Sequence, residues 1–162
     1  MQIDSLEQLF VEELRDLYNA EKQILKALPK VAKKIQNPEL RMAVEEHYEQ
    51  TENQVDRLEQ VLGKLGESPR GKKCKAMQGL IEENNEMMAE DASPEIMDAG
   101  LIVGLQKVEH YEIAGYGSCV SFAKLLGNTE AAELLAKTLD EEEKTDKRLT
   151  QIAKQAVNTK AQ

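Results

Sequence analysis

Apolar residues recur at the spacing of an α-helix in four long segments of the chain. These segments cover about residues 4–35, 38–65, 94–126 and 130–157. Apolar side chains three and four positions apart lie on one face of an α-helix, and that face is buried in a folded protein. The chain has only nine Gly and four Pro residues and is rich in Glu, Lys, Ala, Leu and Gln, which favour helices. The pattern therefore predicts an all-α fold and argues against an antiparallel β-sandwich.

Capping and breaking residues separate the four segments. Asp4 and Glu7 are predicted to cap the first helix, and Pro29 is predicted to kink it. Asn37-Pro38 and Ser93-Pro94 each read as an N-cap followed by a proline in the first helical position. Gly127-Asn128 ends the third long helix. A loop with the sequence GESPRGKK and a short helix over about 76–90 lie between the second and third long helices.

The lengths of the connections predict how the helices are arranged. The first and third connections are a few residues long, so residues 4–65 and 94–157 are expected to form antiparallel hairpins. A 24-residue helix is about 36 Å long, and the segment 66–93 can run back over that distance. Residues 1–162 are therefore expected to form one domain. Its predicted fold is a ferritin-like four-helix bundle with a long crossover containing a short fifth helix.

The two hairpins also resemble each other in sequence. A shift of 91 positions aligns residues 20–60 with 111–151 and matches nine of 41 residues, Glu21 with Glu112 among them. The helix break at residue 37 coincides with the one at residue 128. The repeat predicts an approximate two-fold axis within the bundle.

Charge and cysteine content exclude several functions. The chain has 30 acidic and 21 basic residues, a net charge of -9, which argues against nucleic acid or an anionic membrane as the partner. Its most apolar stretch, 96–126, carries too many charges to span a bilayer, and the first residues lack the pattern of a signal peptide. A cytoplasmic protein is expected. The two cysteines, Cys74 and Cys119, cannot form a disulfide framework or a zinc ribbon.

Several carboxylates interrupt the apolar faces, where leucine is expected. They are Glu21, Glu109, Glu112, Glu142 and Asp146. Ionised carboxylates are almost never buried unless they are paired or bind a metal. No Lys or Arg falls on the same faces. The pattern favours a metal site midway along the bundle. The alternative is that these side chains reach the ends of the bundle or meet an arginine of a dimer partner.

The same segments carry a resemblance to a known family. The chain resembles the YciE/YciF-type ferroxidase-like family, ferritin-like bacterial proteins linked with stress responses. The resemblance covers nearly the whole chain and lies in ELRDLYNAE at 13–21, His47 with Thr51, Gln54, Arg57 and Leu58, KVEHYEIAGYG at 107–117, and Glu141-Glu142-Glu143 with Thr145-Asp146.

The wider rubrerythrin and ferritin group implies two irons, held by a Glu from each of two helices and an ExxH motif from each of the others. By resemblance, Glu21 is the ligand of the first helix. Glu109 and Glu112 are the ligands of the third helix, and Glu142 is the glutamate of the fourth.

The chain departs from that pattern at the nitrogen ligands. Thr145 stands where the fourth helix of the group has a histidine, and Thr51 and Gln54 replace Glu and His on the second helix. The weaker candidates for completing the site are Glu49, Glu52, Glu143 and His47. His47 is interpreted as a residue that supports a ligand or the core.

The resulting hypothesis is a protein with two metal ions, iron first and manganese or another hard divalent ion as alternatives. The implied reaction is a ferroxidase or peroxidase-like oxidation of Fe(II) by dioxygen or peroxide. An oxygen-rich site holds Fe(II) less tightly than one with imidazoles, which leaves a non-catalytic stress or scaffold protein as the alternative. Missing CxxC pairs exclude a complete rubrerythrin electron-transfer chain. Glycines on the third long helix permit close approach of a neighbouring helix, either within the bundle or in a dimer, and a homodimer is expected.

Overall fold

The computed structural model describes residues 2–162, and every regular element in that range is helical. The elements are α1 (Leu6–Lys34), α2 (Pro38–Lys64), α3 (Lys75–Ala89), α4 (Pro94–Leu125), α5 (Thr129–Ile152), a π-helical turn η1 (Ala153–Val157) and α6 (Asn158–Lys160). The all-α prediction is confirmed. The fourth long segment is a regular α-helix only to Ile152 and ends in the π-helical turn.

Most of the predicted helix starts are confirmed. Asn37, Ser93 and Asn128 are N-caps whose side chains accept a hydrogen bond from a backbone N–H of the first turn. The cap of α1 is Ser5 and not Asp4: the Ser5 hydroxyl accepts from the Gln8 N–H at 3.2 Å. The Asp4 prediction was wrong because Ser5 lies one position nearer to the first helical turn. α1 contains Pro29 within its span.

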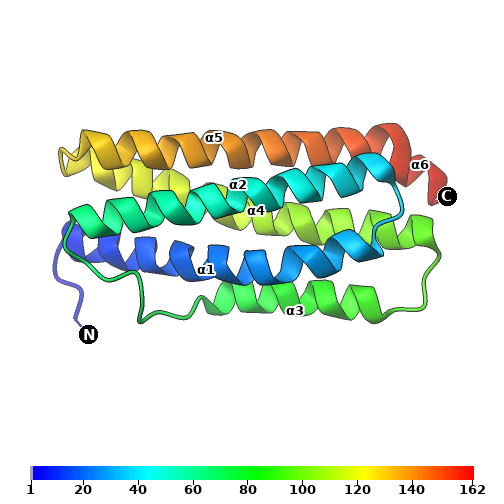
Figure 1. Cartoon of the computed structure of the whole chain (residues 1–162), viewed down its shortest axis with the longest axis horizontal. Helices are drawn as coiled ribbons and strands as arrows, with labels where there is room; N and C mark the ends of the chain where they lie inside the picture. Colours follow the sequence, from blue (N-terminus) through cyan, green and yellow to red (C-terminus); the bar gives the residue numbers. More distant parts are fainter. Residues whose placement is uncertain (1) are drawn as a thin grey trace.

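The four long helices form a bundle, and α3 lies on its outside (Figure 1). α1 packs against α2 and α4, and α5 packs against the same two helices. The crossover carries the chain back along the bundle before α4 begins (Figure 1). α3 in this crossover packs on α1 and α4. The arrangement is the ferritin-like form of the bundle that the connection lengths predict.

At three of the four glycines of α4, side chains of α3 and α1 pack close to the α4 backbone. A Cβ on Gly104 would lie 1.7 Å from Oδ1 of Asn84 in α3, and a Cβ on Gly100 would lie 2.6 Å from Sδ of Met87. A Cβ on Gly115 would meet Leu17 of α1 at 2.7 Å. A Cβ on Gly117 would meet no other side chain and no neighbouring helix within 4 Å. The close approaches therefore lie within the chain itself.

The apolar core has two parts, one toward each end of the bundle. One part includes Leu28, Leu40 and Leu101, and the other includes Leu14 and Leu62. Buried polar side chains from all four long helices lie along the bundle between these two sets. The fold thus surrounds a charged centre with two apolar regions, and that centre is the candidate functional site.

Candidate metal centre

Each of the four long helices contributes at least one polar side chain to the centre of the bundle. The residues are Glu21 of α1, His47 and Gln54 of α2, Glu109 and Glu112 of α4, and Glu142 of α5. His47 is 2% exposed and the other five are 0% exposed. These positions lie on the same helix faces as the buried leucines. Packing of the leucines on both sides therefore forces the polar groups into the interior.

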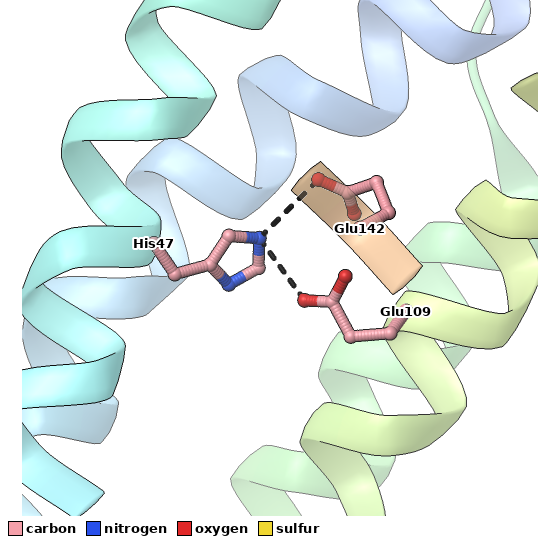
Figure 2. Close-up of side chains that lie close together, drawn as sticks. All are labelled: His47, Glu109 and Glu142. Carbon is pink, nitrogen blue, oxygen red and sulfur yellow. Dashed lines mark ion pairs between the residues drawn. The ribbon is translucent and has the colours of Figure 1, made fainter. Parts of the chain in front are cut away.

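His47, Glu109 and Glu142 form the tightest group within the centre (Figure 2). The His47 Nε2 atom lies 3.0 Å from Oε1 of Glu109 and 3.9 Å from Oε1 of Glu142. One ligand atom from each residue lies within 4.8 Å of the other two. The His47 and Glu109 atoms are close, yet neither has a hydrogen-bond partner, so their orientation does not suit a hydrogen bond. One imidazole and two carboxylates facing one another are a suitable donor set for a divalent cation.

Glu21 and Glu112 are the remaining carboxylates of the centre. The Tyr116 hydroxyl, itself fully buried, donates a hydrogen bond of 2.7 Å to Oε1 of Glu21. Oε2 of Glu21 and both oxygens of Glu112 have no hydrogen-bond partner. Tyr116 therefore holds one oxygen of Glu21 in place and leaves the other free.

Burial and like charge act together on the titration of the centre. Loss of hydration raises the pKa of Glu21, Glu109 and Glu112 well above the ordinary value, and the negative charge of Glu142 raises each pKa further. Burial lowers the pKa of His47, so its imidazole is neutral at neutral pH. A neutral imidazole is the form that binds a metal ion.

The unsatisfied polar atoms of the protein gather at this centre. Within residues 2–162, eight buried side-chain atoms lack a hydrogen-bond partner, and all eight belong to the six residues of the centre. Buried polar atoms without partners are rare in folded proteins because each costs about 1 to 3 kcal/mol. Seven of the eight are oxygens and one is the imidazole nitrogen of His47. A divalent cation offers these atoms the partner they lack.

The predicted site residues fall into two groups. Glu21, Glu109, Glu112 and Glu142 all lie inside the centre. Asp146 does not: its side chain is half-buried, accepts a hydrogen bond from Gln106 at 3.2 Å and lies 3.1 Å from Nε2 of the exposed His110. The expectation that Asp146 points inward was wrong. A residue four positions after Glu142 lies about 40° further round the helix, which here turns it toward the outer edge of α4.

The weaker candidates for metal ligands also fall into two groups, outside and inside the centre. Glu49, Glu52 and Glu143 are exposed and lie away from the centre. His47 is at the centre and not in a supporting position, because it lies one turn before Thr51 on the inner face of α2. Thr51 is too short to reach the centre, and its hydroxyl donates to the His47 carbonyl at 2.7 Å.

Other residues near the centre are not evident from spacing alone. Gln54 donates to Glu142 at 2.6 Å, and Arg57 is buried beside it although no cation was expected on these faces. Gln54 follows His47 by seven positions. Residues at this spacing lie on one helix face, so the spacing predicts that Gln54 points inward as His47 does. Tyr116 follows Glu112 by four positions, a spacing that also places both side chains on one helix face.

Cys74 lies at the start of α3. It caps the N-terminus of α3 and is buried between Asp16 and Tyr111, with its Sγ 3.3 Å from the carboxylate and 3.1 Å from the phenol oxygen. Burial raises the pKa of the thiol. The cationic Lys72 faces Asp16 and Glu12.

The fold and the buried centre together define a ferritin-like helical bundle with a candidate carboxylate and histidine metal centre. Within residues 2–162, no helix has the length and apolar character needed to cross a membrane. Residues 5–162 match the family described as Domain of unknown function (DUF892). The chain belongs to this family, and the resemblance to YciF-type proteins is confirmed.

Three known proteins show how far the likeness extends. Protein YciF of Escherichia coli (strain K12) is 44% identical over 163 residues, which cover 100% of this chain and 98% of YciF. The crystal structure of that protein, described as a stress protein, superposes with a TM-score of 0.92 at 43% identity over 96% of this chain and 99% of YciF. YcfI of Rhodopseudomonas palustris superposes with a TM-score of 0.89 at 40% identity, covering 92% of this chain and 95% of YcfI.

A more distant structure supports the fold class alone. A two-domain protein of Anabaena variabilis contains a DJ-1/ThiJ/PfpI-like domain and a ferritin-like domain. It matches 98% of this chain and 39% of its own length, with 17% identity and a TM-score of 0.62. Together with the all-helical bundle, it confirms the ferritin-like fold.

Proposed function

We propose that this chain is a ferritin-like metal protein of the bacterial stress response whose centre holds two divalent metal ions, iron first. The proposal rests on one observation. All eight buried side-chain N and O atoms of residues 2–162 that lack a hydrogen-bond partner lie in the six residues of the centre. The similarity to YciF, described as a stress protein, supports the physiological context. The ferritin-like fold supports the position of the site between the four helices.

The charge of the centre supports two ions. Glu21, Glu109, Glu112 and Glu142 carry four negative charges when all are ionised, and two divalent cations balance them. His47 adds a neutral nitrogen donor. Carboxylates with one imidazole suit Fe(II) and Mn(II) better than softer metals, which thiolates prefer.

Iron held by the four glutamates and His47 would supply the electrons that reduce dioxygen or peroxide, in a ferroxidase or peroxidase-like reaction. The protein's own residues prepare the site for such chemistry. Tyr116 orients Glu21, Gln54 orients Glu142, and the two apolar regions limit the access of water. Only a small oxidant fits the proposal, because the centre is enclosed by four packed helices.

The proposal is tested by the metal content of protein purified without chelator, combined with anomalous scattering at the iron edge. We expect about two iron equivalents per chain and an anomalous signal among the four glutamates. Glu142→Gln is expected to lose most of the metal, because the centre loses a buried ligand. Glu143→Gln is the matched control: it changes the neighbouring acid, which is exposed, and should keep the metal.

A bundle that stays empty after iron loading contradicts the proposal. It supports instead a non-catalytic helical stress or scaffold protein that kept the bundle and lost the metal. Retained iron in Glu142→Gln together with lost iron in Glu143→Gln would place the site outside the bundle and contradict the proposed position.

A further inference from the structure

A chain of polar contacts joins α2 to α5 directly beside the metal centre. Arg57 of α2 is 8% exposed, and its guanidinium group binds both carboxylate oxygens of Glu141 in α5, at 2.5 and 3.1 Å. The same guanidinium donates to the buried Thr138 hydroxyl at 3.0 Å. Two parallel hydrogen bonds of this kind fix the orientation of a carboxylate as well as its position.

Gln54 connects this ion pair to the centre. Its Nε2 atom donates to Oε1 of Glu142 at 2.6 Å and lies 3.3 Å from Oε1 of Glu141. With the amide reversed, the Gln54 oxygen would face two carboxylate oxygens and repel both. The position of Glu141, set by Arg57, therefore selects the orientation in which Gln54 donates to Glu142.

The Arg57–Glu141 ion pair is not expected to add much to the free energy of unfolding. A buried pair gains little over apolar residues of the same size, because both charges lose their hydration. The pair also adds no net charge to the centre, since the positive Arg57 offsets the negative Glu141. Its contribution is geometric: it fixes the Gln54 amide, and the amide fixes one oxygen of Glu142.

We propose that Gln54 is a positioning residue for the metal ligand Glu142 and that the Arg57–Glu141 pair orients it. This inference rests on the proposed function. Gln54 binds Oε1 of Glu142 and leaves Oε2, which has no hydrogen-bond partner, for the metal. Neither Arg57 nor Glu141 touches the metal in this arrangement. Both act through Gln54.

The test removes the pair without changing net charge. The double variant Arg57→Met/Glu141→Leu is compared with Arg148→Met/Glu46→Leu, which removes another ion pair between α5 and α2. Mn²⁺ affinity is measured by isothermal titration calorimetry at fixed pH, and metal-free thermal unfolding is measured in parallel. Loss of the outer partner of a metal ligand weakens binding by about 10- to 100-fold. We expect that loss in the first variant and less than about a twofold change in the control.

Gln54→Leu should reproduce the loss of affinity and keeps the test decisive if the double variant fails to fold. Equal affinity in wild type and Gln54→Leu contradicts the inference. A fall in metal-free melting temperature with unchanged Mn²⁺ affinity also contradicts it, because it shows a purely structural role. If wild type binds Mn²⁺ and the variants bind equally well, only the inference fails. A wild-type protein that binds no metal contradicts the proposed function as well.

Discussion

Two buried carboxylates of α4, Asp98 near its start and Glu112 near its middle, have opposite surroundings. Asp98 is 4% exposed, and its two oxygens accept hydrogen bonds from the backbone N–H groups of Gln36 and Asn37 at 2.9 and 2.8 Å. Glu112 is 0% exposed, and neither of its oxygens has a hydrogen-bond partner. The carboxylates of Glu21 and Glu142 lie near it and raise its pKa.

The difference separates a carboxylate that the protein itself satisfies from one whose oxygens have no partner in the protein. Asp98 joins α4 to the turn between α1 and α2, and the protein itself satisfies both of its oxygens. Glu112 has free oxygens and like-charged neighbours, an arrangement that costs folding free energy unless a cation is present. Burial is common to both acids. They differ in the number of hydrogen-bond partners, and this difference supports the proposed metal site at Glu112.

The largest expected effect is the loss of Asp98. Asp98→Ala leaves the part-buried backbone N–H groups of Gln36 and Asn37 without their carboxylate acceptor, and we expect the free energy of unfolding to fall by about 3 kcal/mol. Urea denaturation followed by circular dichroism measures the change. Glu95→Ala, one turn earlier and exposed, is the control and should cost about 0.5 kcal/mol or less. Equal losses in the two variants would show that Asp98 has no special structural role.

A smaller effect of opposite sign is expected at Glu112. In the metal-free protein, Glu112→Gln keeps the size of the side chain and replaces a buried acid, whose ionisation is opposed by burial and by the neighbouring carboxyl groups, with a neutral amide. We expect the free energy of unfolding to rise by about 1 kcal/mol at pH 8. With Mn²⁺ present, the variant should gain less in melting temperature than wild type, because it binds the metal less tightly. A destabilised metal-free variant with an unchanged metal response would contradict the contrast with Asp98.

Much of the fold and part of the centre could be predicted from the sequence. Helix periodicity, the caps at Asn37 and Ser93 and the break at Gly127-Asn128 locate the helices, because all are local properties. The positions of Glu21 and Glu112 among leucines show that these acids point inward, since burial of a helix face is set by its apolar residues. The topology follows from the lengths of the connections, because a short connection makes two helices antiparallel and a long one can cross back along the bundle.

The remaining features depend on how each helix is rotated against its neighbours. His47 reaches the centre, whereas Asp146, which lies about 40° round α5 from Glu142, turns to the edge of α4. The pairing of Arg57 with Glu141 joins residues of different hairpins, so no spacing within one helix reveals it. Contacts between helices determine the finer geometry of the centre.

The gain from Glu112→Gln should itself depend on pH. In the metal-free wild type, the folded-state pKa of Glu112 is raised above its unfolded-state value. Between those two pKa values the folded protein binds more protons than the unfolded one, so its stability falls as pH rises. Below that range Glu112 is protonated in both states and, like Gln, carries no charge.

The advantage of the variant is therefore complete above the folded-state pKa and shrinks as pH falls toward the unfolded-state value. Urea denaturation of both proteins from pH 8 to pH 5, with chelator present, measures the difference at each pH. The carboxyl groups of Glu21 and Glu109 titrate together with Glu112, so the change should extend over a broad pH range. A constant difference across the range would mean that Glu112 keeps its charge in the folded protein. The contrast between Glu112, which lies among other carboxyl groups, and Asp98, which lies among N–H donors, would then be wrong.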